Sequence, residues 1–283
     1  MIKINYQELI TDIKFKNVTI NENHFPDNTL LLKTNDINWG KPIEIIWFYE
    51  SDSELFTIIC LAKKAKNKKY LYMPYCPHAR QDRIKNEDDT FTLKYFTEVI
   101  NSLEFETVQI LDPHSSVCEA LINNVIIESP KYYIEKIINN NFINDISLNK
   151  FSLFYPDNGC MKRNENTFKM PYTFGLKKRD WETGEIRGLD IVGDETFIKG
   201  KKVLIVDDIC SRGGTFYHSA KKLKELGAEE VYLYVTHCEN TILEGDLLTS
   251  GLIEKVFTTN SIFTKEHEKI EIYELRGDTK WIQ

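Results

Sequence analysis

The segment from Val203 to Thr215 constrains the fold of this chain more than any other part of the sequence. It reads Val-Leu-Ile-Val-Asp-Asp-Ile-Cys-Ser-Arg-Gly-Gly-Thr, an apolar strand that ends in two carboxylates and runs into a glycine turn. The next residues, Phe216 to Leu226, predict a helix with outward lysines, and Gly227 stands where a left-handed helix end is expected. Strand, turn and helix in this order are typical of an α/β sheet.

The polar residues of this segment have chemistry that suits a sugar phosphate. Ligands of open parallel sheets bind beyond the carboxyl ends of the strands, so Asp207 and Asp208 are expected to accept hydrogen bonds from ribose hydroxyls. Gly213 and Gly214 let backbone amides approach a phosphate, and the helix N-terminus and the Thr215 hydroxyl add donors. A bare Asp-Asp pair is usually a solvated strand end, but strand, glycines and helix in register favour a binding site.

Other short apolar runs alternate with helical patterns along the chain, which again indicates an α/β fold. We expect strands at Ile43–Phe48, Tyr70–Tyr75, Val108–Leu111, Phe151–Tyr155, Val203–Val206 and Val231–Val235. Between the second and third, Thr92 is expected to cap a crossover helix whose apolar face consists of Leu93, Phe96, Ile100 and Leu103.

The length of 283 residues, 42% of them hydrophobic, predicts two domains. A polar, asparagine-rich stretch, residues 132–149, separates two halves that each contain strand–helix units. We therefore expect one sheet domain over residues 1–138 and a second over residues 139–283.

Charge and cysteine usage narrow the class of protein. Acidic residues outnumber basic ones, 43 to 36, and this net charge of -7 argues against a nucleic-acid partner. The six cysteines form no C-x-x-C pair, which indicates reduced thiols. The sequence starts without an apolar signal core and has no run of 18 apolar residues, so we expect a soluble intracellular protein with no membrane partner.

The first half carries a basic stretch, Met73-Pro-Tyr-Cys-Pro-His-Ala-Arg-Gln-Asp-Arg83, just past an expected strand. Arg80 and Arg83 bracket Gln81 and Asp82, and guanidinium groups suit a nucleotide polyphosphate. Taken alone, the same string fits a surface salt-bridge loop equally well.

Together these stretches resemble the phosphoribosyl-pyrophosphate synthetase family. The loop from Asp207 to Thr215 is similar to a motif that the synthetases share with type I phosphoribosyltransferases, whereas the Pro-Tyr-x-x-x-Ala-Arg-Gln-Asp-Arg string matches the synthetases alone. The likeness covers nearly the whole chain and marks it as a divergent member of the phage or bacterial type. It implies two tandem type I phosphoribosyltransferase-like domains, the first holding ATP and the second the ribose phosphate, each a mostly parallel sheet flanked by helices.

The resemblance also implies roles for residues of the nucleotide site. Arg80, Gln81 and Asp82 stand at the positions that bind ATP. The strand end Leu111-Asp-Pro-His114 looks like the family's Asp-Leu-His, whose histidine helps to place Mg²⁺ on ATP, and Tyr155-Pro-Asp-Asn-Gly159 resembles its second metal element. His114 and Asp157 are thus metal candidates, although a lone histidine and an Asp-Asn-Gly turn are often purely structural.

Two further stretches align with functional elements of the family. Leu176-Lys-Lys-Arg-Asp180 stands where the family has a catalytic basic loop, which implies catalytic roles for Lys177 and Arg179, with Lys178 an alternative for the lysine. A solvated basic hairpin is the structural alternative. Phe25-Pro-Asp27 is similar to an adenine clamp that reaches into a neighbouring subunit's ATP site, but Asn28 and Thr29 replace its Gly and Glu. This implies adenine contacts from Phe25 and Asp27 and a homo-oligomer, a dimer or a hexamer.

The activity that the resemblance implies is a Mg²⁺-dependent transfer of pyrophosphate from ATP to the anomeric hydroxyl of ribose 5-phosphate, in the cytoplasm or, for a phage protein, the host cytoplasm. The loop from Asp207 to Thr215, which we call the phosphate loop, departs from the family, since Ser211 and Arg212 replace its Asp and Thr and make the loop more positive by about two charges. Arg212 can bind a second phosphate, so ADP-ribose, in NAD salvage, is an alternative acceptor.

Two other functions remain open for this sequence. A phosphoribosyltransferase would use the same loop from Asp207 to Thr215, but the stretch from Arg80 to Arg83 argues against it. A non-catalytic regulatory homologue would bind the ligands without turnover. Lys177, Arg179, His114 and Asp157 argue for an enzyme.

Overall fold

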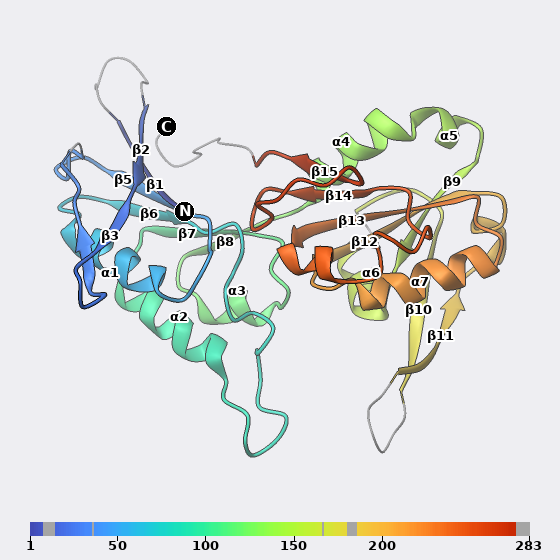
Figure 1. The fold of residues 1–283 in the computed structure, drawn as a ribbon, viewed down its shortest axis with the longest axis horizontal. Helices are drawn as coiled ribbons and strands as arrows, with labels where there is room; N and C mark the ends of the chain where they lie inside the picture. The colour runs from blue at the N-terminus through green and yellow to red at the C-terminus, as the bar shows by residue number, and fades with distance from the viewer. Residues whose placement is uncertain (8–14, 36, 166, 180–185, 276–283) are drawn as a thin grey trace. The chain divides into compact units, whose positions relative to one another are not determined.

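The computed structural model describes residues 1–7, 15–35, 37–165, 167–179 and 186–275. The chain divides into two compact units, with Met1–Ser129 in the first and Pro130–Leu275 in the second (Figure 1). The boundary expected after residue 138 falls within helix α4 (Lys131–Asn141) of the second unit. This polar stretch is an amphipathic helix, since Tyr133, Ile134, Ile137 and Ile138 are buried.

The first unit is built on a sheet with the strand order β2-β1-β5-β6-β7-β8. The four strands β5 (Ile43–Trp47), β6 (Lys69–Tyr72), β7 (Thr107–Leu111) and β8 (Val125–Glu128) are parallel. β1 (Ile2–Gln7) and β2 (Phe15–Ile20) extend the sheet in antiparallel fashion. Three helices accompany it, α1 (Glu54–Lys64), α2 (Thr92–Ser102) and α3 (Val117–Leu121), and together they enclose the core (Figure 1).

The second unit is built on a sheet with the strand order β11-β10-β9-β12-β13-β14-β15. All neighbours in it are parallel except β10 and β11. Its strands are β9 (Phe151–Tyr155), β10 (Tyr172–Arg179), β11 (Ile186–Val192), β12 (Lys202–Cys210), β13 (Glu230–Cys238), β14 (Val256–Thr259) and β15 (Ile270–Tyr273).

Helices cover both faces of the second sheet. α7 (Gly214–Glu225) buries Phe216, Ala220 and Leu223 against one face. On the other face, Phe142 joins α4 to α5 (Ile143–Ser147) and packs on Phe151 and Tyr232, with ring centroids 4.7 Å and 4.8 Å apart. The shorter elements are α6 (Asn158–Asn164) and the 3₁₀ turns η1 (Glu195–Phe197) and η2 (Asn240–Glu244).

The expected α/β class is confirmed, and so are the expected strands, with end shifts of a few residues. β6 ends at Tyr72, short of the expected Tyr75, because the chain turns there into the Met73–Arg83 stretch. The predicted apolar face of α2 is buried at Leu93, Phe96, Ile100 and Leu103. Thr92, however, does not cap this helix: it lies in the first turn, and its hydroxyl donates to Gln81 Oε1 at 2.9 Å. In the described part of the chain, no helix has the length and apolar character to cross a bilayer.

Candidate active site

The phosphate loop of the second unit begins near the carboxyl end of β12 and runs to the start of α7. Asp207 and Asp208 lie among the last residues of this strand, and Gly213 precedes α7 with a φ of 82°. That left-handed conformation favours glycine, and it turns the chain so that the free amides at the start of α7 face the loop. Amides and helix dipole together make an anion site, and Gly214 and Thr215 form the first residues of the helix.

A second segment, η2 and the Gly245 that follows it, packs against this loop. The hydroxyls of Ser211 and Thr241 lie 3.2 Å apart, and Arg212 pairs with Glu244 at 2.9 Å. A Cβ added to Gly245 would lie 1.9 Å from the Arg212 carbonyl oxygen, so only glycine fits there. The loop conformation is therefore set by residues some thirty positions further along the chain.

The two carboxylates of the loop lie in a crowded acidic environment. Burial, together with the neighbouring Asp208 and, more weakly, Asp157, raises the pKa of Asp207 well above its usual value. Asp208 is buried, with 4% of its side chain exposed, and its Oδ1 accepts a hydrogen bond from Arg163 at 2.9 Å. A ligand that brings hydroxyl donors or a cation would relieve the excess of negative charge.

Asp157 lies at the carboxyl end of β9, beside β12, and caps α6 by accepting from the Cys160 amide at 3.0 Å. No group of three or more acidic, histidine or cysteine side chains within the described ranges could hold a metal ion. Mg²⁺ usually takes one or two carboxylates and completes its shell with waters and substrate phosphates. Asp157 near Asp207 offers carboxylate oxygens of that kind, so the donor set fits Mg²⁺ arriving with a phosphate ligand.

The arginine-containing loop of the first unit follows β6, at the carboxyl edge of its sheet. Arg80, Gln81 and Arg83 are exposed, whereas Asp82 is buried. Asp82 accepts from Arg83 Nε and Nη2, both at 2.7 Å, and from Ser115 at 2.6 Å. These partners hold the pKa of Asp82 well below its usual value.

The histidine-containing loop follows the neighbouring strand β7 and leads into α3. His114 is exposed there, and Ser115 joins this loop to the arginine-containing loop through Asp82. The structure thus brings two stretches together that the sequence places more than thirty residues apart. Ser115 was missed at the sequence level, because a serine after Pro-His carries no signal of its own.

Phe25 and Asp27 lie at the tip of a hairpin made by β3 (Glu22–His24) and β4 (Leu30–Leu32). Phe25 is exposed, and Asn28 occupies a left-handed conformation with a φ of 66°. Asp27 accepts from the amide and hydroxyl of Thr29, at 3.0 Å and 2.7 Å, and these bonds lower its pKa. Asn28 and Thr29 therefore still close a tight turn that presents an aromatic ring.

Lys177, Lys178 and Arg179 belong to β10, which pairs with β11 and has a register irregularity between Lys178 and Arg179. Their side chains lie outside the part of the chain that the structure describes, as does Asp180. At the level of the backbone, the expected basic loop is the end of a strand.

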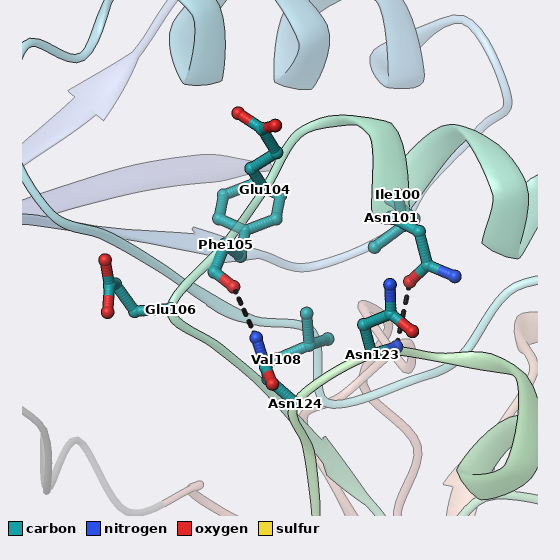
Figure 2. A pocket seen from close by; sticks show the side chains of 8 residues that line it. All are labelled: Ile100, Asn101, Glu104, Phe105, Glu106, Val108, Asn123 and Asn124. Atoms are coloured by element: carbon teal, nitrogen blue, oxygen red, sulfur yellow. Dashed lines mark hydrogen bonds between the residues drawn. The ribbon is translucent and has the colours of Figure 1, made fainter.

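A hollow of about 280 Å³ lies elsewhere in the first unit, beneath the end of α2 (Figure 2). It adjoins the amino ends of β7 and β8, opposite to the strand ends that carry the two loops. Its asparagines are engaged in holding the backbone, since Asn101 accepts from the Asn123 amide at 2.9 Å and Asn124 donates to the Phe105 carbonyl at 3.3 Å (Figure 2). We therefore place no substrate there.

Comparison with known proteins agrees with this geometry. The family model described as phosphoribosyl synthetase-associated domain matches residues 178–277. The chain is 26% identical to the ribose-phosphate pyrophosphokinase of Sulfolobus acidocaldarius, over 87% of this chain and 85% of the relative. It is 28% identical to the one of Pyrococcus abyssi, over 88% and 85%. Over most of its length the chain is similar to ribose-phosphate pyrophosphokinases.

The fold agrees with this similarity as well. The phosphoribosylpyrophosphate synthetase of Mycobacterium smegmatis superposes with a TM-score of 0.73 over 90% of this chain and 86% of that one, at 17% identity. The two phosphoribosyltransferase-like sheet domains expected from the sequence are thus confirmed. Members of the ribose-phosphate pyrophosphokinase family are diphosphotransferase enzymes.

Proposed function

We propose that this chain transfers the β,γ-pyrophosphate of ATP to the anomeric hydroxyl of ribose 5-phosphate, giving phosphoribosyl pyrophosphate and AMP. The observation that carries the proposal is the phosphate loop: two carboxylates at a strand end, a left-handed Gly213 and the amides of α7 in one continuous segment. The name of the relatives, ribose-phosphate pyrophosphokinase, supports the same chemistry.

In this proposal the acceptor is held by the second unit. Asp207 and Asp208 accept hydrogen bonds from the ribose hydroxyls, while the 5′-phosphate accepts from the amides of Gly213 and Gly214 and from the Thr215 hydroxyl. Ser211 adds a hydroxyl that Thr241 orients. Holding the sugar at both ends fixes the direction of its anomeric oxygen, and such positioning is a large part of catalysis.

ATP is assigned to the first unit. Arg80 and Gln81 are exposed beside the anchored Asp82, where phosphates and ribose can reach them, and His114 stands on the loop that Ser115 ties to Asp82. Phe25 supplies a ring for the adenine in the ATP site of a neighbouring subunit, and Asp27 keeps its turn closed. Asp82 acts in this scheme by positioning its neighbours.

The chemical step is a displacement at the β-phosphorus of ATP. The anomeric oxygen attacks in line and loses its proton, the bond from the β-phosphorus to the bridging oxygen breaks, and AMP leaves with that oxygen. Lys177 and Arg179 neutralise the charge that spreads over the phosphoryl oxygens. His114 would help to place Mg²⁺ on the ATP phosphates and Asp157 would hold a second metal ion, and each ion would supply further neutralisation.

The first experiment is to incubate the purified protein with MgATP and either ribose 5-phosphate or ADP-ribose, and to measure AMP release and product mass. We expect AMP and a product heavier than ribose 5-phosphate by one pyrophosphate. No AMP with either acceptor, although both are bound, would favour a regulatory homologue.

ADP-ribose remains a second candidate acceptor because of one observation. Arg212 is 71% exposed, and its ion pair with Glu244 is equally open to solvent. Such pairs contribute at most about 1 kcal/mol, so a second phosphate can displace Glu244. Pyrophosphate transfer to ADP-ribose alone would make this the physiological acceptor class.

The two adjacent lysines offer a matched test of the catalytic assignment. Lys177→Ala is expected to lower kcat by about a thousandfold with little change in the KM for ATP, because the cation acts on charge that develops in the transition state. Lys178→Ala, which removes the same charge one residue away, should lower kcat less than fivefold. The reverse pattern would assign the role to Lys178. A wild-type kcat in both variants would show that neither lysine takes part in the chemical step.

A further inference from the structure

Arg163, a residue outside every motif of the sequence, contacts the two carboxylates of the phosphate loop. Its Nη2 lies 2.9 Å from Asp208 Oδ1 and 3.8 Å from Asp207 Oδ1. Arg163 comes from α6, a helix that follows β9, whereas the carboxylates belong to β12. The contact therefore joins two elements that the chain visits more than forty residues apart.

The helix that carries Arg163 is itself fastened to the same strand end. Asp157 caps its first turn, and the Cys160 thiol donates to the Val206 carbonyl at 3.1 Å. Asn164 donates to the Cys160 carbonyl at 3.0 Å. Because Val206 directly precedes Asp207, these bonds fix the position of the guanidinium relative to the carboxylates.

The charges indicate why this contact matters. Asp208 is almost fully buried beside a second carboxylate, while the Arg163 side chain is 39% exposed. Removal of one partner from a buried charge pair leaves the other uncompensated, which is strongly unfavourable. Without Arg163, the two carboxylates would repel each other and turn away from a common ligand.

We infer that Arg163 is a positioning residue for the acceptor: it holds Asp207 and Asp208 side by side so that both can accept from the vicinal hydroxyls of one ribose. This inference rests on the proposed function for the identity of the sugar. Arg163 acts through the carboxylates and does not touch the reacting atoms. Ribose 5-phosphate should therefore depend on Arg163 more than an analogue that lacks one of the two hydroxyls.

The test is calorimetric binding of ribose 5-phosphate and of 2-deoxyribose 5-phosphate, without ATP, to wild type, Arg163→Gln and Arg163→Lys. Arg163→Gln should weaken the binding of ribose 5-phosphate about tenfold, because hydrogen bonds to charged groups are lost. Binding of 2-deoxyribose 5-phosphate to this variant should weaken less than threefold. The ratio of the two affinities, which measures the preference for ribose, should therefore fall. Arg163→Lys keeps the charge on a shorter side chain and should lie between wild type and Arg163→Gln.

Lys162→Gln is the matched control, since it removes one positive charge from the adjacent exposed position of the same helix. It should bind both sugars as wild type does. Equal losses for the two sugars in Arg163→Gln, or wild-type binding of ribose 5-phosphate, would overturn the inference. If Arg163→Gln does not fold, Arg163→Lys decides, and wild-type affinity and preference in that variant would overturn it. Binding without AMP release contradicts the proposed transfer reaction only.

Discussion

The two units treat the carboxylates of their loops in opposite ways. In the first unit, Asp82 accepts from Arg83 and Ser115, and these partners keep its pKa well below the usual value. In the second unit, burial and the adjacent Asp208 raise the pKa of Asp207 well above it, although Arg163 stands nearby. Asp82 is stabilised by partners within its own unit. Asp207 and Asp208 share the single guanidinium of Arg163, so an excess of negative charge remains on the pair.

In the proposed function, this difference separates a residue that stabilises the fold, Asp82, from residues that bind the acceptor, Asp207 and Asp208. A carboxylate whose partners are all supplied by the fold stabilises the loop without any substrate. A crowded pair gains stabilisation when a ligand donates hydroxyl hydrogens or brings a cation. We therefore expect Asp82 to affect ATP indirectly and the Asp207–Asp208 pair to affect the acceptor directly.

Glu44 shows that a raised pKa alone does not mark a binding site. It lies on β5 with 2% of its surface exposed, and burial raises its pKa from 4.5 to about 7. Its partner is Asn5, which donates from Nδ2 at 3.0 Å, while Asn5 Oδ1 has no hydrogen-bond partner among the described residues. What distinguishes Asp207 is its place at a strand end, followed by a glycine turn and a helix.

Among the carboxylates compared here, the largest effect is expected from Asp208→Asn, which tests the acceptor side of the comparison. Loss of the buried charge should raise the KM for ribose 5-phosphate about a hundredfold, while the KM for ATP stays within twofold. Asp194→Asn is a suitable control because asparagine can keep the cap that Asp194 provides for η1. Equal changes in both KM values would show a general loss of structure.

Glu44→Gln should stabilise the protein above neutral pH. Since the folded pKa exceeds the unfolded one, wild-type stability falls as pH rises from about 4.5 to about 7. Glutamine remains neutral and can donate to Asn5 Oδ1, so the free energy of unfolding at pH 8 should rise by about 2 kcal/mol. Urea unfolding at pH 5 and pH 8, followed by tryptophan fluorescence, checks this. A gain that is the same at both pH values would show that Glu44 is not the titrating group.

The smallest effect is expected from Asp82→Asn, which sharpens the comparison on the nucleotide side. Asparagine keeps the size and a bond to Ser115 but loses the charge opposite Arg83, so the arginine-containing loop should loosen. We expect the KM for ATP to rise about tenfold and the KM for the acceptor to stay unchanged. Asp88→Asn, an exposed carboxylate of the same loop region, should leave both values unchanged. A hundredfold loss in kcat with Asp82→Asn would place this residue in the chemistry.

Much of the fold was predictable because its strands are long apolar runs. β9, β12 and β13 are buried along most of their length, and such strands stand out in any sequence. β1, β2, β10 and β11 were not expected, because these strands mix charged with apolar residues; each of the two pairs forms an antiparallel hairpin at one end of its sheet. The helix α4 was not expected, and the domain boundary was placed within it, because its asparagines hide a buried isoleucine face.

The residues of the candidate site also fall into a predictable group and a group that the sequence does not reveal. Asp207, Asp208, Gly213 and Arg80 were predictable because each belongs to a short segment in which residue order alone fixes the local geometry. Arg163, Ser115 and Glu244 were not, because each meets its partner across a separation of more than thirty residues.

The sequence by itself determined the two sheets, the glycine turn before α7 and the kinds of chemical group at the strand ends. These features depend on local conformational preference and on which residues are apolar. Only the tertiary structure decided that Asp82 is satisfied by Ser115 and that Asp208 is paired with Arg163. Hydrogen bonds and charge pairs depend on distances of a few ångströms between elements, and no local pattern encodes those distances.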